Sequence, residues 1–380
     1  MKILHVGTFP FPSPQGSQVY VKGILEGLSD LGHDVSLLCY GHGYGEDPPN
    51  IRIIRTPNIP FYHNMRAGPD WIKPILDVLM IPFLRKERPD VIHVHNYEAP
   101  LVAKIANMLR RSSIPIVYSA HNLMEEELPS YFEGRRSQKL MSHFGRVLDR
   151  NVPQMTEHCV VLSEVGRRKL KELGCKNISL IYPGVAATEF EDVIPQKLPE
   201  GRWVIYAGNP DQYQDLDILM EAMSFLPEVG LVMVSASDTR KWRRKGKGRT
   251  LHIQTQNFKE VCGYLEKAHV GVLPRVQCSG FPIKVLNYLA MGLPVVCSEG
   301  SKFDVPSVFS VPNHSPEKMA KKISWLLSQE DRRLVIGLDG QNFVFKELSW
   351  KKQAERLEKI YQAEIQDMKN KYRKKDKFLL

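Results

Sequence analysis

The chain has 380 residues, more than one hydrophobic core usually holds and enough for two domains of under about 200 residues each. Hydrophobic residues make up 43% of it and charged residues 25%, which excludes a disordered, fibrous or membrane-spanning chain. The longest apolar stretch, at 75–84, has about half the length of a bilayer span. No secretory leader is recognised at residues 1–12, so we expect a cytoplasmic protein.

The net charge of +10 is concentrated in two segments. Residues 240–249 contain seven Lys or Arg and no acid, and residues 369–377 contain six against one Asp. The rest of the chain is slightly acidic, which argues against a nucleic-acid partner. Two interpretations stay open for these segments: solvated charge, or attraction to an anionic membrane surface.

Apolar runs alternate with segments of helical period along almost the whole chain, which is typical of parallel sheets with crossover helices. In the first half we predict strands at 2–6, 34–39, 51–55, 90–94, 115–119, 159–162 and 178–181. We predict helices between them at 17–31, 73–88, 99–111, 136–151 and 164–173.

The pattern begins again after a polar stretch that ends near residue 202. We predict strands at 203–207, 230–235, 251–254, 270–273 and 294–297, and helices at 215–226, 259–267, 283–291 and 315–328. A last amphipathic helix, at about 350–370, is expected to pack back on the first domain. The predicted domains are 1–182, 183–348 and a C-terminal crossover helix with a basic tail at 349–380. Two open α/β sheets predict a ligand site at the carboxyl ends of their strands, in a cleft between the domains.

The six cysteines are far apart and form no C-x-x-C pair, so they are predicted to be reduced core thiols. Three histidines follow strand ends: His93, His95 and His121. They could in principle hold zinc, but no carboxylate accompanies them at ligand spacing, and we expect no metal. His121 directly follows an apolar strand, where its ring can donate to a ligand oxygen.

Two predicted helix starts carry residues that could contact a ligand. Gly16 and Ser17 open the first helix, where free backbone N–H groups attract anions. Asp215 and Asp217 form a D-x-D sequence, which can hold a divalent metal, but here it opens a helix and the acids are predicted to favour the helix N-terminus.

The densest polar segment is 273–296, a strand, a glycine-containing loop, a helix and Gly-Leu-Pro before the next strand. The helix start near Phe281 is predicted to accept a diphosphate. Arg275 and Lys284 would supply positive charge, and Asn287, one turn later, would reach ribose hydroxyls.

At this point the chain resembles glycosyltransferase family 4, the retaining group with the GT-B fold, over nearly its full length. The resemblance rests on the opening at 1–6 with Gly16, on the segments 31–35, 88–95, 181–185 and 206–209, and on Gly-Phe-Pro…Ala-Met-Gly-Leu-Pro-Val-Val at 280–296. It implies two Rossmann-like α/β domains that face each other across a cleft, the second of which binds a nucleotide sugar.

The chain departs from the family pattern at four charged positions. Ser279 and Asn287 stand where the family usually has two glutamates, and Asn209 and Gln214 stand where it usually has an Arg and a Lys that grip the diphosphate. The resemblance assigns the catalytic contact with the sugar or diphosphate to His121. It places Gly16, Ser17 and His95 on the acceptor or phosphate side. The donor-binding set is Asn209, Gln214, Arg275, Ser279, Gly280, Phe281, Pro282, Lys284 and Asn287.

The resemblance implies a retaining transfer of a hexose from a nucleoside-diphosphate sugar to a glycan or lipid-linked acceptor in envelope polysaccharide synthesis. The donor phosphate itself would take the acceptor's proton, without a metal. We expect the protein at the inner face of the membrane, held by its basic segments. Two alternatives are a non-catalytic sugar-nucleotide-binding protein, favoured by the four neutral positions, and a sugar-nucleotide 2-epimerase, disfavoured by the absence of acids at Ser279 and Asn287.

Overall fold

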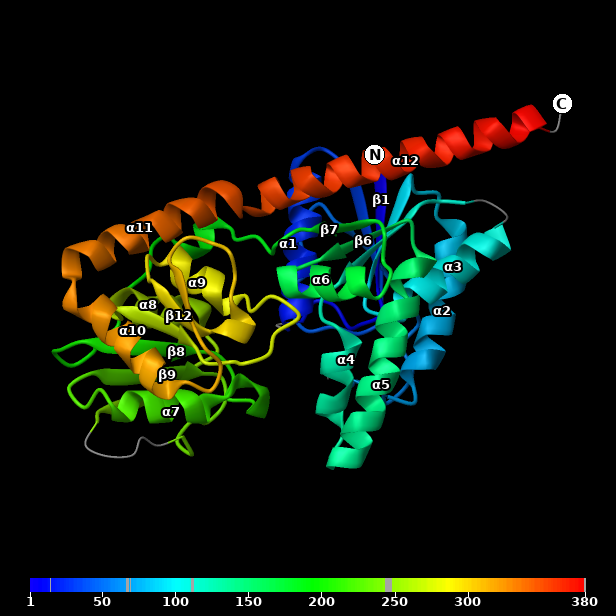
Figure 1. The fold of residues 1–380 in the computed structure, drawn as a ribbon. Helices are drawn as coiled ribbons and strands as arrows, with labels where there is room; N and C mark the ends of the chain where they lie inside the picture. Colours follow the sequence, from blue (N-terminus) through cyan, green and yellow to red (C-terminus); the bar gives the residue numbers. More distant parts are fainter. Residues whose placement is uncertain (14, 66–67, 69, 111–112, 243–247, 379–380) are drawn as a thin grey trace. The chain divides into compact units, whose positions relative to one another are not determined.

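The computed structural model describes residues 1–13, 15–65, 68, 70–110, 113–242 and 248–378, with the backbone alone for 372–378. The chain folds into two compact units (Figure 1). Unit 1 comprises Met1–Gly184, Ser279–Phe281 and Trp350–Leu380, and unit 2 comprises Val185–Cys278 and Pro282–Ser349. Three residues of the second half's polar loop therefore belong to unit 1, which the sequence did not indicate.

Unit 1 is built on a seven-stranded parallel sheet in the order β3-β2-β1-β4-β5-β6-β7. Every strand predicted for the first half is present. The strands are β1 (Lys2–Gly7), β2 (Asp34–Cys39), β3 (Arg52–Arg55), β4 (Val91–His95), β5 (Ile116–Ala120), β6 (His158–Val161) and β7 (Ile178–Leu180).

Helices cover both faces of this sheet. They are α1 (Gly16–Asp30), α2 (Lys73–Lys86), α3 (Ala99–Arg110), α4 (Met124–Glu127), α5 (Arg135–Asn151), α6 (Glu164–Glu172) and α12 (Trp350–Phe378), with 3-10 turns at Leu128–Tyr131 and Pro153–Met155. Alternate residues of a strand face opposite sides. Leu4 and Ile92 pack in the core with α2 and α3, whereas His5 and His93 face the side of α1 and α12, where Tyr361 contacts His93.

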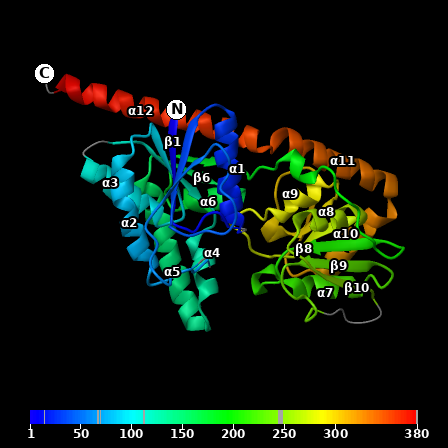
Figure 2. The same ribbon diagram turned by 180° about the vertical axis from the view of Figure 1, so that it is seen from behind.

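The last helix, α12, packs along α1, as the sequence predicted (Figure 2). Ala354, Leu357 and Tyr361 are fully buried. Glycine permits the close approach, since a Cβ at Gly23 would lie 2.1 Å from the Trp350 ring. The apolar stripe of α12 therefore completes the core of unit 1.

Unit 2 contains a six-stranded parallel sheet in the order β10-β9-β8-β11-β12-β13. Its strands are β8 (Trp203–Ala207), β9 (Gly230–Ser235), β10 (Thr250–Gln254), β11 (Val270–Leu273), β12 (Val295–Ser298) and β13 (Val308–Val311). Its helices are α7 (Leu216–Ser224), α8 (Phe258–Lys267), α9 (Lys284–Ala290), α10 (Pro316–Ser328) and α11 (Glu330–Glu347), with 3-10 turns at Ala187–Phe190, Gln212–Gln214 and Glu299–Ser301. The sequence predicted neither β13 nor α11.

The six cysteines are buried and free, which confirms their prediction as core thiols. In the part of the chain that the structure describes, no helix is long and apolar enough to cross a membrane.

Candidate functional site

A cavity of about 80 Å³ opens in unit 1 at the carboxyl ends of three adjacent strands. Its lining includes Thr8 after β1, Glu98 after β4, and His121 and Asn122 after β5. Ligands of open α/β sheets bind at this edge. The predicted position of a site at the strand ends therefore coincides with a cavity in this unit.

The cavity lining carries an acid and a cation that the sequence analysis did not select. Glu98 accepts a hydrogen bond from Thr8 Oγ1 at 3.2 Å, and burial, followed by the negative charge of Asp77, raises the pKa of Glu98 to about 7. Lys73 donates to the carbonyl oxygen of Gly68 at 2.6 Å, and burial lowers its pKa. A carboxyl group with a pKa near neutrality exchanges protons readily at physiological pH.

His121 also lines the cavity, and His95 lies behind it. His95 Nδ1 is 3.2 Å from His121 Nε2, and His95 Nε2 is 2.9 Å from His5 Nδ1. His95, which the resemblance places on the acceptor or phosphate side, is fully buried and lies behind the lining residues His121 and Phe9. Burial lowers the pKa of His121 to about 4 and that of His5 to about 3, so both rings are neutral near pH 7.

The structure groups His93 and His95 with His5, whereas the sequence analysis considered them together with His121. Nitrogens of His5, His93 and His95 lie within 4.8 Å of one another, a metal-like grouping, whereas His121 stands outside it. His93 uses both ring nitrogens, one toward Tyr361 Oη and one 2.7 Å from Ser119 Oγ. Both ring nitrogens of His93 are therefore engaged by protein groups.

The two predicted site residues at the start of α1 lie in different surroundings. Ser17 lines the cavity and donates from Oγ to Gln18 Oε1 at 2.6 Å. Gly16 is exposed and is not part of the lining.

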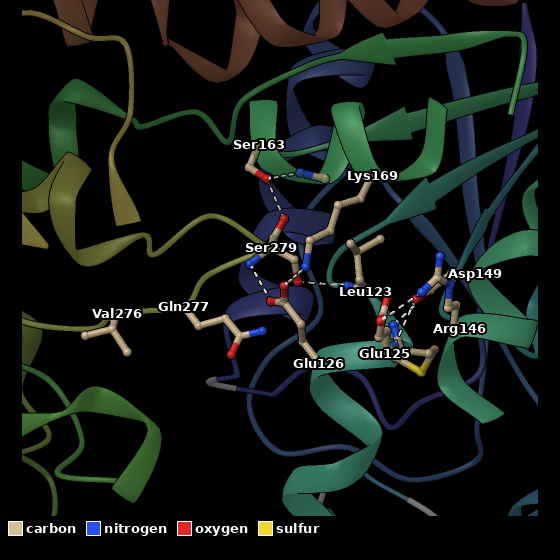
Figure 3. A network of polar contacts seen from close by, with 12 residues as sticks. Leu123, Glu125, Glu126, Arg146, Asp149, Ser163, Lys169, Val276, Gln277 and Ser279 are labelled. Atoms are coloured by element: carbon tan, nitrogen blue, oxygen red, sulfur yellow. Dashed lines mark hydrogen bonds and ion pairs between the residues drawn. The ribbon is translucent and has the colours of Figure 1, made fainter. Parts of the chain in front are cut away.

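Ser279 is held by unit 1 through all of its polar groups (Figure 3). Its backbone N–H donates to Glu126 Oε2 at 3.0 Å, and its hydroxyl accepts from the Leu123 N–H at 3.0 Å. Its carbonyl oxygen accepts from the Ser163 hydroxyl, and Lys169 donates to the other Glu126 oxygen. The side chain is 5% exposed, so it serves to anchor the loop rather than to offer a free hydroxyl.

The next two loop residues are packed equally closely. A Cβ at Gly280 would lie 2.1 Å from Asn122 Oδ1, so a larger residue does not fit there without rearrangement. The ring of Phe281 packs 5.4 Å from that of Tyr182. Both residues therefore hold the loop in place by packing and do not leave an open side chain for a ligand.

Unit 2 brings several predicted donor residues together around Lys284. Lys284 Nζ donates to Tyr206 Oη at 2.9 Å and to Gln214 Oε1 at 3.1 Å. Gly208, at φ +145°, lies directly against this ammonium group, and Tyr206 donates to the carbonyl oxygen of Asn209 at 2.7 Å. Burial, followed by the charge of Arg275, lowers the pKa of Lys284 to about 7.

Arg275 lies nearby, with its guanidinium 4.8 Å from the Tyr213 ring centroid and Nε donating to the Gln277 carbonyl at 2.6 Å. Pro282 lies two positions before the start of α9, and Asn287, half-buried, lies about one turn after Lys284. The side chain of Asn287 thus stays a candidate ribose contact.

The D-x-D acids lie at the start of α7, as predicted, but neither makes a side-chain cap bond there. Asp215 precedes α7 at φ 53° and makes no side-chain cap bond; its carboxylate accepts from the Val276 N–H at 2.9 Å instead. Asp217 is exposed in the first turn. Asp215 therefore helps to fix the loop after β11 through this hydrogen bond.

Glu98, Lys73 and Glu126 are among the site residues that sequence reasoning missed. A signal existed for Glu98, which follows β4 by three positions, where site residues of parallel sheets gather. Lys73 and Glu126 reach their positions through tertiary packing alone.

Comparisons with known proteins agree with this architecture. Residues 14–189 match the family model described as Glycosyltransferase Family 4, and residues 201–329 match the model described as Glycosyl transferases group 1. A phosphatidyl-myo-inositol mannosyltransferase of Mycolicibacterium smegmatis is 23% identical over 351 residues, 88% of this chain and 86% of that protein.

Solved structures share the fold at low sequence identity. Sucrose-phosphate synthase from Thermosynechococcus elongatus has a TM-score of 0.77 at 17% identity, over 96% of this chain and 99% of that one. Anabaena HepE in complex with UDP and glucose has a TM-score of 0.68 at 12% identity, over 96% and 100%.

Proposed function

The chain is a glycosyltransferase of the family 4 type with the GT-B fold, and from that premise we propose that it transfers a hexose from a nucleoside-diphosphate sugar to a hydroxyl group with retention of configuration. The observation that carries this proposal is the polar site around Lys284 in unit 2. There a partly buried ammonium group, an amide and a phenol converge beneath Gly208, in the unit that matches the glycosyl transferases group 1 model.

Lys284 and Arg275 are the cations proposed to hold the diphosphate, in place of the two charges missing at Asn209 and Gln214. Gln214 has a role in this site, because its side-chain oxygen accepts a hydrogen bond from Lys284 and orients the ammonium group. Charge-assisted hydrogen bonds to phosphate are about twice as strong as neutral ones, which favours these two cations as its ligands. Asn287 is proposed to bind the ribose hydroxyls.

We propose that no divalent metal is needed at the D-x-D sequence. The Asp215 carboxylate is engaged by the Val276 N–H, which uses the acid to fix the loop that leads to Arg275. The reaction then depends on stabilising the charge of the departing diphosphate, whose oxygen takes the acceptor's proton.

The cavity of unit 1 is proposed as the acceptor site, for the uncharged hydroxyls of a glycan or lipid-linked sugar. Glu98 and Glu127 both line it, and their carboxylates disfavour a phosphorylated acceptor group. Lys73, His121 and Gln18 add donors for hydroxyl oxygens. The cavity therefore suits a neutral polyol.

Reversible attachment to an anionic membrane is part of the proposal; the basic segments 240–249 and 369–377 stay candidates for it, and the described residues add a surface on α5. Residues 243–247 lie outside the described residues, as do the side chains of 372–380. The described surface carries exposed Leu140, Phe144 and Val147 on α5. Arg136 and Lys139 are exposed on the same helix, which gives it the character of an interfacial helix.

Turnover tests the proposal directly. The purified protein would be incubated with a panel of UDP- and GDP-hexoses, with and without a membrane extract, and nucleotide release and labelled product would be followed. We expect release that depends on the extract and on one sugar nucleotide. Binding of nucleotide without turnover in any extract would favour the non-catalytic function, which the neutral Ser279 and Asn287 support.

A further inference from the structure

Three histidines in unit 1 form a continuous row of ring nitrogens that ends at the cavity. His5 Nδ1 lies 2.9 Å from His95 Nε2, and His95 Nδ1 lies 3.2 Å from His121 Nε2. His5 and His95 are fully buried, and His121 lines the cavity. Because Nε2 of His121 is engaged by His95, Nδ1 is the ring nitrogen left for a ligand.

The row has only two self-consistent proton arrangements. A neutral imidazole has one N–H donor and one acceptor nitrogen. Burial lowers the pKa of His5, His95 and His121, so each ring carries one proton near pH 7. The three rings therefore donate either all toward the cavity or all away from it, and the far end of the row decides between these directions.

The far end is Nε2 of His5, which is buried and has no hydrogen-bond partner among the described residues. If the rings donated away from the cavity, this atom would be a buried N–H without an acceptor. If they donate toward it, the atom has only a lone pair. Orphaned buried N–H groups are rarer in proteins than under-satisfied acceptors. The second arrangement is therefore favoured.

We propose that His5 and His95 are positioning residues that hold His121 as a neutral Nδ1–H donor, aimed at a sugar hydroxyl oxygen in the cavity. The identity of the ligand rests on the proposed function, whereas the tautomer does not. The Tyr20 ring packs edge-on against His121, with centroids 5.1 Å apart at 88°, which restrains the ring plane. In this state His121 donates to its ligand and does not act as a general base.

Nitrogen NMR of the full-length protein, labelled with ¹⁵N-histidine and free of substrate, tests the tautomer. Signals are assigned by their loss in single histidine variants. At pH 7.5 we expect His5, His95 and His121 all to be protonated at Nδ1 and bare at Nε2. A coupling across the hydrogen bond should connect the His95 Nδ1 proton to His121 Nε2. A proton on His121 Nε2, or on both nitrogens, would overturn the proposal.

The variant H5F separates positioning from simple packing. It removes the donor to His95, so the His95 Nε2 signal should move toward that of a nitrogen without a hydrogen bond. An unchanged signal would contradict the row. So would one equivalent of zinc in the wild-type protein that is lost in H5F, because a metal would occupy the lone pairs.

Activity provides a second, independent readout once a donor sugar is known. In H121N an amide N–H can replace the Nδ1 donor, whereas H121D offers only acceptors of similar size. We expect H121N to retain at least tenfold more kcat than H121D, with similar melting temperatures. Equal or reversed activities would overturn the donor role. If no turnover is found at all, the proposed function fails, and the NMR result still decides the tautomer.

Discussion

Lys284 Nζ lies 2.9 Å from Tyr206 Oη and 4.3 Å from the centroid of the same ring. These contacts hold the ammonium group in a partly buried position close to Arg275, and burial with that neighbouring charge lowers the pKa of Lys284 to about 7. In the ligand-free protein Lys284 therefore gives up its proton at a much lower pH than an ordinary lysine does. A bound diphosphate favours the charged form and raises this pKa again.

Nucleotide binding should consequently take up protons. We expect the affinity for UDP or GDP to be highest below pH 7 and to fall above it, by up to about tenfold per pH unit, until the pKa of the complex is reached. Titration calorimetry at several pH values, in buffers with different ionisation enthalpies, measures the uptake directly. Affinity that rises with pH would contradict the assignment.

The variant K284M should weaken binding by about tenfold or more, because it removes a charged hydrogen bond to phosphate. Its residual binding should take up no proton. R275A should also weaken binding, but with less uptake at pH 7, since the pKa of Lys284 rises when its charged neighbour is lost. Uptake that persists in K284M would assign the proton to another group.

The second prediction concerns Ser279, where the resemblance suggested a lost acid. The backbone N–H of Ser279 already binds the Glu126 carboxylate. S279E would place a second carboxylate beside it in a buried setting and displace the hydroxyl that accepts from Leu123. We expect a loss of roughly 2 kcal/mol or more of stability and no gain in activity.

Urea unfolding of S279E, E126Q and the double variant would check this. The double variant should recover part of the stability lost in S279E, because the carboxylate pair is removed. If S279E is as stable as the wild type and more active, the loop position is a vacant acid site after all.

The strands were predictable because their residues are apolar on both faces, as in Val204–Tyr206. Helix α11 was not, because its buried side includes Gly337 and Gly340 rather than an apolar stripe. A Cβ at Gly337 would lie 2.0 Å from the Gly292 carbonyl oxygen, so close backbone contact replaces side-chain burial. The spacing of hydrophobic residues therefore could not predict this helix.

The candidate site was predictable only in part. Lys284 and His121 stood out as polar residues next to apolar strands or glycine loops. His5 did not, because it occupies an ordinary position within β1, and its role depends on His95 in the neighbouring strand. The function of Glu126 likewise depends on Ser279, which is distant in sequence.

The third prediction follows from the buried histidines. Burial lowers the pKa of His5, His93, His95 and His121 below the ordinary value of 6.5. The unfolded chain therefore binds more protons at these residues below pH 6.5. Each histidine should remove about 1.4 kcal/mol of stability per pH unit as the pH falls from 6.5 toward the folded pKa.

Three buried carboxyl groups oppose this trend. Burial raises the pKa of Asp77 and Asp149 to about 6 and that of Glu98 to about 7, so they favour folding as the pH falls through that range. Four histidines outweigh them, and we expect urea unfolding to show lower stability at pH 5 than at pH 7. D77N should steepen the decline and H121N should flatten it. A flatter decline of stability in D77N, or a steeper one in H121N, would contradict this explanation of the pH dependence.

The last prediction concerns the surface of α5. Leu140, Phe144 and Val147 are exposed at helical spacing, with relative exposures of 63%, 51% and 43%. Exposed Arg136 and Lys139 lie on the same helix, whose one acid, Asp149, is buried and accepts from the Met124 N–H. The outer surface of α5 thus combines apolar side chains with positive charge, of which Arg146 is paired with Glu125; this is the pattern of an interfacial helix on anionic lipid. We expect the protein to sediment with phosphatidylglycerol vesicles and not with phosphatidylcholine vesicles. Binding should fall steeply with salt, because screening limits the attraction to within about 10 Å at 0.1 M ionic strength. The triple variant L140S/F144S/V147S should weaken binding by about tenfold or more, since each side chain contributes apolar burial.

The matched control is L334S/V335S/L338S on α11, which removes similarly exposed apolar residues and should leave binding unchanged. Equal loss in both variants, or binding that persists until residues 369–380 are deleted, would assign attachment to another surface.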